Sequence, residues 1–231
     1  VTGGGGQLGF EFCKSLAEAG AAVVAADLNM DLATQTANRL TESGYSAIAF
    51  PLDVTRIEST RELVAETTKQ FGRLDILVNS GWSGRKNTFE SISDDDWNND
   101  IEVCRNGVFR TIKAASPLLK ARRGNILTIA SMYGHIAPDH RMYDSERFSN
   151  PPSYGAAKAG VIQLTKYLAS FLSPHGVRAN CISPGPFPFE STQKENPDFV
   201  ARLAAKNPLN RIGKPHELKG AAALLCSDAG S

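Results

Sequence analysis

A tyrosine and a lysine stand four positions apart in the segment Tyr154-Gly-Ala-Ala-Lys158. In a helix this spacing puts both side chains on the same face. A tyrosine with a pKa near 10 is a poor acid or base at neutral pH, but a nearby ammonium stabilises its phenolate. Lowering that pKa by about three units needs roughly 4 kcal/mol, which a close lysine together with a second cation could supply. The pair predicts acid–base chemistry, although the same spacing also occurs in ordinary surface pairs.

A glycine-rich turn lies near the start of the chain, where residues 2–9 read TGGGGQLG. Glycines let the backbone approach phosphate groups closely, and the N-terminus of the helix that follows presents unpaired amides and a partial positive charge. No Gly-Lys-Ser/Thr follows, which excludes a P-loop. The turn predicts a pyrophosphate site, and the alternative is a flexible turn without a ligand.

An acidic residue, Asp27, ends the next apolar segment, eighteen residues after Gly9. A carboxylate in this position can accept hydrogen bonds from the adenosine ribose hydroxyls and repels a 2′-phosphate. Neither Leu28 nor the glycine turn offers an arginine or lysine to receive such a phosphate. The sequence therefore predicts NAD in preference to NADP. Alternatively, Asp27 could cap a helix near Asp31.

Short β-branched segments alternate with longer amphipathic ones, which is typical of a parallel sheet between helices. Strands are predicted at residues 21–26, 46–50, 74–79, 125–130 and 177–183. Helices are predicted between Leu8 and Gly20, at residues 56–71, from Ser93 to Lys120 and at residues 153–172. The expected fold class is α/β, a Rossmann-like doubly wound parallel sheet with helices on both faces.

The length of 231 residues suits one domain with a sizeable core. We expect residues 1–231 to form a single dinucleotide-binding and catalytic domain whose first strand and C-terminal strand are incomplete. Residues 134–152 and 185–198 are the least regular stretches, and long loops in a compact domain are usually functional or mobile.

The composition argues against several classes of protein. Lys and Arg number 25 against 24 Asp and Glu, so there is no basic field to attract nucleic acid or an anionic membrane. The longest apolar stretches fall short of the roughly 20 residues that span a bilayer, and no secretory signal begins the chain. The four cysteines form no CxxC pair, so we expect buried thiols in a cytoplasmic protein rather than a zinc site. The expected partner is a small-molecule substrate.

These motifs resemble, in order and spacing, those of the classical short-chain dehydrogenase/reductase family over essentially the whole chain. TGGGGQLG resembles the family's TGxxxGxG, Leu52-Asp53-Val54 its adenine-contacting segment, and Asn79-Ser80-Gly81 its Asn-Asn-Ala-Gly turn. Ser131 follows the segment NILTIA, Tyr154 and Lys158 fit YxxxK, and Ser183-Pro184-Gly185 resembles the Pro-Gly turn beside the nicotinamide.

The resemblance implies hydride transfer with catalytic residues Ser131, Tyr154 and Lys158. Tyr154 would donate a proton to a carbonyl oxygen, or remove one from an alcohol, and Ser131 would hydrogen-bond that oxygen. Lys158 would lower the pKa of the tyrosine and hold the nicotinamide ribose. The implied cofactor contacts are Gly3, Gly6, Gln7, Leu8, Gly9, Asp27, Asp53, Val54, Asn79, Gly81, Tyr154, Lys158, Pro184 and Gly185. Asp53 could instead form a turn, and Asn79 could bind backbone between strands.

Two departures from the family pattern lie at the cofactor site. A family glycine falls at Gln7, although Gly4, Gly6 and Gly9 still satisfy GxGxxG one residue earlier. The helix could pack slightly farther from the strand here, or Gly6 could take the role of the missing family glycine. The last glycine of the turn after the third predicted strand falls at Trp82, which could narrow the cleft or simply pack.

The connection from Ser131 to Tyr154 is about ten residues longer than is usual in the family, too long for a plain connection. Its polar residues suggest a sugar-like or hydroxy-acid substrate, unless the loop is a solvated excursion. These residues are His135, Asp139, His140, Arg141, Tyr143, Asp144, Glu146 and Arg147. The two histidines have no further clustered ligands, so we expect no metal.

The resemblance also implies a homotetramer or homodimer. Apolar residues of two helices could serve as core or as interface, and the sequence does not divide them: Phe109, Ile112, Leu118, Leu119, Leu164, Tyr167, Leu168 and Phe171. Two other functions remain open, a dinucleotide-binding regulator or scaffold with impaired catalysis and an NADPH-dependent ketoacyl reductase.

A third departure bears on the mechanism and gives a testable prediction. The family usually has an asparagine where this chain has Cys104, and its carbonyl anchors a water that feeds protons to the lysine. A thiol is a weak hydrogen-bond partner. We therefore expect Cys104→Asn to preserve or raise turnover, and a large loss of turnover in a folded variant would contradict this interpretation.

Overall fold

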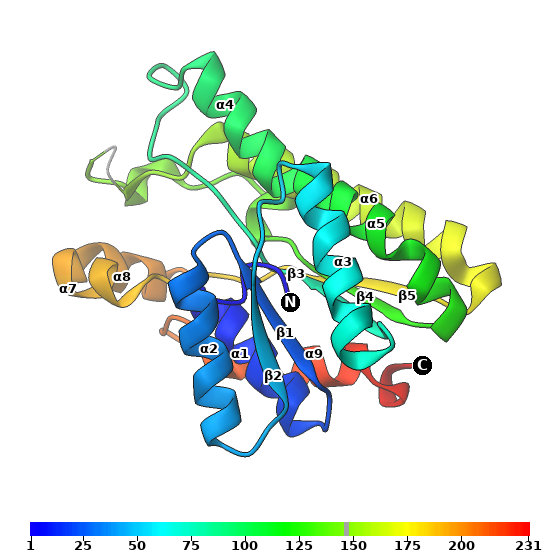
Figure 1. Ribbon diagram of the computed structural model, residues 1–231. Helices are drawn as coiled ribbons and strands as arrows, with labels where there is room; N and C mark the ends of the chain where they lie inside the picture. Colours follow the sequence, from blue (N-terminus) through cyan, green and yellow to red (C-terminus); the bar gives the residue numbers. More distant parts are fainter. Residues whose placement is uncertain (146–147) are drawn as a thin grey trace.

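A parallel sheet forms the centre of the computed structural model, which describes residues 1–145 and 148–231 (Figure 1). The strands are β1 (Val23–Asp27), β2 (Ala47–Pro51), β3 (Ile76–Asn79), β4 (Asn125–Ile129) and β5 (Arg178–Ile182). β1 pairs with β2, β3 with β4, and β4 with β5, all in parallel. Thr2 forms parallel bridges to both Ala26 and Asn79, so it joins the two groups of strands into one sheet.

The connections make the sheet doubly wound. From Thr2 the chain passes through β1 to β2 on one side, and then returns to β3, β4 and β5 on the other side. The strand order therefore reverses next to the glycine turn. In open α/β sheets, ligands bind at the carboxyl ends of the strands beside such a reversal.

Helices cover both faces of the sheet (Figure 1). On one face lie α1 (Gln7–Glu18), α2 (Met30–Glu42) and α9 (Lys219–Cys226), and on the other lie α3 (Ile57–Phe71), α5 (Gly107–Arg122) and α6 (Pro152–Leu172). α4 (Asp94–Ile101) leads through a π-helical turn, η1 (Glu102–Asn106), into α5. Beyond β5 lie the short helices α7 (Glu190–Glu195) and α8 (Pro197–Ala205).

The two faces of the sheet explain the apolar sequence of its strands. Val78 and Leu127 pack with Phe12 of α1, whereas their neighbours Leu77 and Ile126 pack against α5 and α6. Successive side chains of a strand point to opposite faces, so strands covered on both sides need apolar residues at nearly every position. The predicted fold class is confirmed.

The predicted helix boundaries agree closely with the structure. Ser93 caps α4 by accepting a hydrogen bond from the amide of Asp96 at 3.1 Å, and Gly72 ends α3 with a φ of 72°. The predicted helix from Ser93 to Lys120 is interrupted by η1. The stretch 185–198, predicted to be irregular, contains α7, which is a correction. No helix in the described part of the chain is long and apolar enough to cross a membrane.

Leu127 offers a test of the packing, because its side chain is fully buried between the sheet and the helical layer of α1 and α9. Leu127→Ala should lower the free energy of unfolding by about 2–5 kcal/mol through the lost burial and the cavity left behind. Leu224→Ala is the matched control, since Leu224 is 49% exposed. It should change the free energy of unfolding by less than about 0.5 kcal/mol. Urea unfolding measures the free energy of unfolding of both variants. An equal loss of stability in the two would contradict the packing described for Leu127.

Candidate active site

A cleft of about 890 Å³ opens at the carboxyl ends of the strands, beside the reversal of strand order. All of the predicted site residues except Asn79 line it: Gly3, Gly6, Gln7, Leu8, Gly9, Asp27, Asp53, Val54, Gly81, Ser131, Tyr154, Lys158, Pro184 and Gly185. Asn79 is buried at the end of β3, where its Oδ1 accepts a hydrogen bond from Thr111 Oγ1 at 2.6 Å. Residues far apart in the sequence therefore meet in one cleft.

The glycine turn has two positions that admit only glycine. Gly3 has a φ of 65°, and a Cβ there would lie 2.7 Å from the amide nitrogen of Gly81. A Cβ on Gly9 would lie 1.9 Å from the carbonyl oxygen of Gly3. The close approach of α1 to the turn is thus retained although Gln7 replaces a family glycine. Gly6 precedes α1 and provides no side-chain cap, so the first amides of the helix can face a ligand.

Asp27 lies at the end of β1 and links the glycine turn to the sheet. Its Oδ2 accepts a hydrogen bond from the amide of Gly5, and its Oδ1 accepts one from the amide of Asn29, both at 3.0 Å. Asn29, not Asp27, caps α2, because its side chain accepts from the amides of Asp31 and Leu32. The alternative that Asp27 is a helix cap is therefore wrong. Its carboxylate also borders the cleft.

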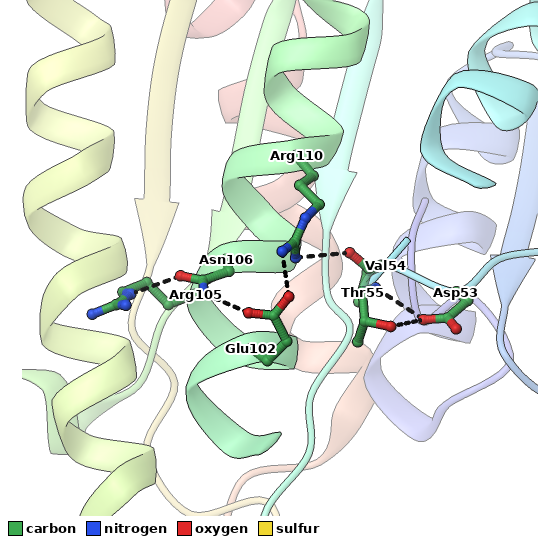
Figure 2. Close-up of polar contacts among 7 residues, drawn as sticks. All are labelled: Asp53, Val54, Thr55, Glu102, Arg105, Asn106 and Arg110. Atoms are coloured by element: carbon green, nitrogen blue, oxygen red, sulfur yellow. Dashed lines mark hydrogen bonds and ion pairs between the residues drawn. The ribbon is translucent and has the colours of Figure 1, made fainter. Parts of the chain in front are cut away.

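The adenine-contacting segment predicted at Asp53 and Val54 is held from two sides (Figure 2). Asp53 Oδ1 accepts hydrogen bonds from the amide and hydroxyl of Thr55 at 2.9 and 2.6 Å, so Asp53 does form a turn. On the other side, Arg110 donates to the carbonyl oxygen of Val54 at 3.5 Å and forms an ion pair with Glu102 of η1. Arg110 was not identified from the sequence, because its partners lie far from it along the chain.

Ser131, Tyr154 and Lys158 lie on the wall formed by the end of β4 and the start of α6. Lys158 is almost fully buried, and its ammonium donates to the carbonyl oxygen of Ile129 at 2.6 Å. The same nitrogen lies 5.6 Å from the centre of the Tyr154 ring. The helix-face argument from the sequence thus placed the two side chains correctly relative to one another.

The ionisation of this pair differs from the prediction. Burial raises the pKa of Tyr154 to about 12, and a hydrogen bond with Ser131 only partly opposes the increase. Burial also lowers the pKa of Lys158. The predicted lowering of the tyrosine pKa relied on the lysine together with a second cation, and the side chains by themselves do not produce it, because burial raises the pKa of the phenol. Tyr154 is a neutral phenol at pH 7, which suits a proton donor.

Cys104 has a structural role that the sequence did not reveal. Its buried thiol donates to the carbonyl oxygen of Ser83 at 3.1 Å, and its sulfur accepts from the amide of the same residue at 3.2 Å. Asp100, fully buried on α4, accepts from the hydroxyl of Ser83 at 3.3 Å and from that of Ser153 at 2.6 Å. These contacts fix the loop after β3 against α4 and α6, so an asparagine at position 104 would have to hold Ser83 as well.

Trp82, held by this loop, forms part of the cleft wall next to Tyr154. The two rings meet edge to face with their centres 6.3 Å apart. Trp82 also stacks on Phe189, the residue before α7, with the two ring centres 6.1 Å apart. Trp82 is still 45% exposed and borders the cleft, which favours narrowing of the substrate end over ordinary core packing.

The charged residues that the structure describes in the long loop after Ser131 do not line the cleft. Asp139 pairs with Arg141 and with Lys206 at 2.8 Å, and Asp144 pairs with Arg202 at 2.8 Å. Lys206 and Arg202 lie in or beside α8, so the loop is attached to that helix. Its described residues that line the cleft are Met132, Tyr133, Tyr143, Phe148, Asn150 and Pro151. Of the polar loop residues named in the sequence analysis, Tyr143 therefore borders the cleft and the other described ones do not, while Glu146 and Arg147 lie outside the described part of the chain.

The cleft fits a dinucleotide. The close backbone approach at Gly3 and Gly9 and the uncapped start of α1 suit a pyrophosphate, and Asp27 suits a ribose. The Nδ2 atom of buried Asn79 has no hydrogen-bond partner, as expected for a donor directed at a ligand or a water. The described residues contain no group of three or more side chains that could bind a metal.

Comparison with known proteins identifies the family. Residues 6–231 match the family described as enoyl-(acyl carrier protein) reductase. L-Fucose dehydrogenase from Bos taurus is 35% identical over 99% of this chain and 82% of its own, and 5-keto-D-gluconate 5-reductase from Escherichia coli (strain K12) is 29% identical over 99% and 87%. The crystal structure of a gluconate 5-dehydrogenase from Burkholderia cenocepacia J2315 in complex with NADP and tartrate is 31% identical, with a TM-score of 0.88 over 99% of this chain and 87% of the other.

The chain therefore belongs to the short-chain dehydrogenase/reductase family. It is an NAD(P)-dependent oxidoreductase acting on hydroxyl or keto groups.

Proposed function

We propose that this protein is an NAD-dependent oxidoreductase that transfers hydride between nicotinamide and a secondary alcohol or ketone. The observation that carries the proposal is the shared cleft. Ser131, Tyr154 and Lys158 border it at one end, and Gly3 and Asp27 border it at the other. One elongated ligand can therefore contact the glycine turn while its other end reaches the phenol.

In the proposed reaction the bound nicotinamide supplies or accepts the hydride. Ser131 donates a hydrogen bond to the substrate oxygen and holds it beside Tyr154. Tyr154, a neutral phenol, donates its proton to that oxygen during reduction and takes it back during oxidation. Lys158, anchored on the carbonyl oxygen of Ile129, keeps a positive charge beside the phenol as the proton leaves.

The preference for NAD over NADP rests on charge. Asp27 presents its carboxylate at the ribose end of the cleft, where a 2′-phosphate would meet a like charge. Lys86 and Lys158 are the cations among the described residues that line the cleft, and both come from elements at the substrate end. Among the described residues that line the cleft beside Asp27, none has a positive charge that could neutralise a phosphate.

For the substrate we propose a polar, sugar-like molecule or a hydroxy acid. The relatives that act on L-fucose and 5-keto-D-gluconate support this choice by analogy. In the cleft, Trp82 and Phe189 supply flat walls, and the amides of Asn99 and Asn150 supply hydrogen-bonding groups. Such a combination suits a ring or chain that has both apolar faces and hydroxyls.

We also propose that the protein is a homotetramer or homodimer and acts in the cytoplasm. Phe109 of α5 and Tyr167 and Phe171 of α6 are at least half exposed, whereas Ile112 and Leu119 are core residues. Exposed aromatic residues on adjacent helices are typical of a subunit interface. The four cysteines, all free, suit a reducing compartment.

Tyr154→Phe tests the reaction. Loss of the hydroxyl removes the proton donor, so turnover of sugars, sugar acids and simple ketones should fall at least about 100-fold while NAD affinity is retained. Tyr167→Phe is the control, because Tyr167 lies on the same helix with 59% exposure. Initial rates and NADH fluorescence titration give the two quantities. NADH binding by the wild-type protein without turnover of any substrate would favour the regulator, and full activity of Tyr154→Phe would overturn the mechanism.

Asp27→Asn tests the cofactor preference. The wild-type enzyme should have the higher kcat/KM with NAD, and the variant should lose about 10-fold or more of that value, because a charge-assisted hydrogen bond to the ribose is weakened. Asp31→Asn, in the exposed first turn of α2, should retain the preference. A wild-type preference for NADPH would overturn the assignment and favour the ketoacyl reductase.

A further inference from the structure

The substrate end of the cleft contains a lysine, Lys86, that has no counter-charge among the residues that the structure describes. Lys86 follows Trp82 by four residues in the loop after β3, and its side chain borders the cleft together with Ser83 and Asn99. In the described part of the chain it forms no hydrogen bond or ion pair. Its neighbours are engaged, since Arg85 pairs with Asp96 at 2.8 Å and Asn87 donates to the same carboxylate at 3.1 Å.

The other charges along the cleft have their own partners. Lys158 is bound to a backbone carbonyl, and Asp27 and Asp53 accept hydrogen bonds from backbone amides at the adenosine end. Glu195 also borders the cleft and is itself engaged in an interaction. Although part of its side chain is exposed, burial lowers the pKa of Lys86 below the ordinary value for lysine. An ammonium that is partly removed from water and lacks a counter-charge is stabilised by an anion that enters the cleft.

We propose that Lys86 is a specificity-determining residue that binds a carboxylate of the substrate, so that the natural substrate is a hydroxy acid or keto acid rather than a neutral sugar. The inference rests on the proposed function and narrows its substrate class. Lys86 and Trp82 belong to one loop, and the contacts of Ser83 with Cys104 and Asp100 fix that loop. The loop that carries Lys86 is therefore fixed, and it extends along the cleft from Trp82, which contacts Tyr154. The amides of Asn99 and Asn150 border the same space and can complete the carboxylate's hydrogen bonds.

The test compares matched ligands that differ only in their carboxylate groups. D-Gluconate and D-sorbitol form one pair, which differs in one carboxylate, and L-tartrate and L-threitol form a second, which differs in two. Each is titrated into the complex with reduced cofactor, and binding is followed by cofactor fluorescence. The wild-type enzyme should bind each carboxylate more tightly than its neutral partner, and Lys86→Gln should weaken carboxylate binding by about 10- to 100-fold while leaving the neutral ligand unchanged.

Two controls separate charge from folding. Lys86→Arg keeps the charge and should retain most of the preference, and Arg85→Gln removes an adjacent surface cation and should leave it intact. Thermal unfolding checks that each variant is folded. Equal binding of charged and neutral ligands by the wild-type enzyme, or a preference that persists in Lys86→Gln, would overturn the proposal. Because this test measures binding and the Tyr154→Phe test measures turnover, the proposal for Lys86 can fail while the proposed reaction is supported. The proposed reaction can likewise fail while Lys86 binds a carboxylate.

Discussion

The backbone pairing of Thr2 with two strands is the constraint on which the rest of the molecule depends. Thr2 bridges Ala26 on one side and Asn79 on the other, and so closes the sheet at the point where its strand order reverses. The next residue, Gly3, must then turn sharply, with a φ of 65°, directly against Gly81. The glycine turn, the carboxylate after β1 and the loop after β3 meet at one place because this pairing brings their strands side by side.

The sequence predicted those parts of the fold whose signals are local. Strands covered on both faces consist of nearly continuous apolar residues, and α3, α4 and α6 start or end at recognisable serine, glycine or proline positions. The extent of α2 was not predicted beyond a possible helix start near Asp31, because its sequence MDLATQTANRLTE has few large apolar residues. α7 is short and polar and follows a proline-rich stretch. Its helical form is set by neighbouring structure more than by its own pattern.

The same distinction applies to the site. The positions of Ser131, Tyr154, Lys158 and Asp27 in one cleft followed from motif order and strand ends, while their chemical roles remain predictions. The contacts of Asp100 could not be predicted, since its partners Ser83 and Ser153 lie on different elements. The sequence shows the charged residues of the loop after Ser131. It does not show that this loop is hydrogen-bonded to α8, about sixty residues further along the chain. The pKa of Tyr154 likewise depends on burial, which a sequence motif does not specify.

The π-helical turn between α4 and α5 has a consequence for how this stretch of the chain is aligned. Each residue of an α-helix advances the side-chain direction by about 100°, so the wider turn at Glu102–Asn106 offsets the faces before and after it. Asp100 can thereby face α6 while Thr111 faces Asn79 of β3. A single uniform helical wheel drawn through residues 94–122 would place Asp100 and Thr111, eleven residues apart, within about 20° of each other, although they contact different elements. Homologues that differ by one residue in this turn are therefore best aligned in two separate blocks.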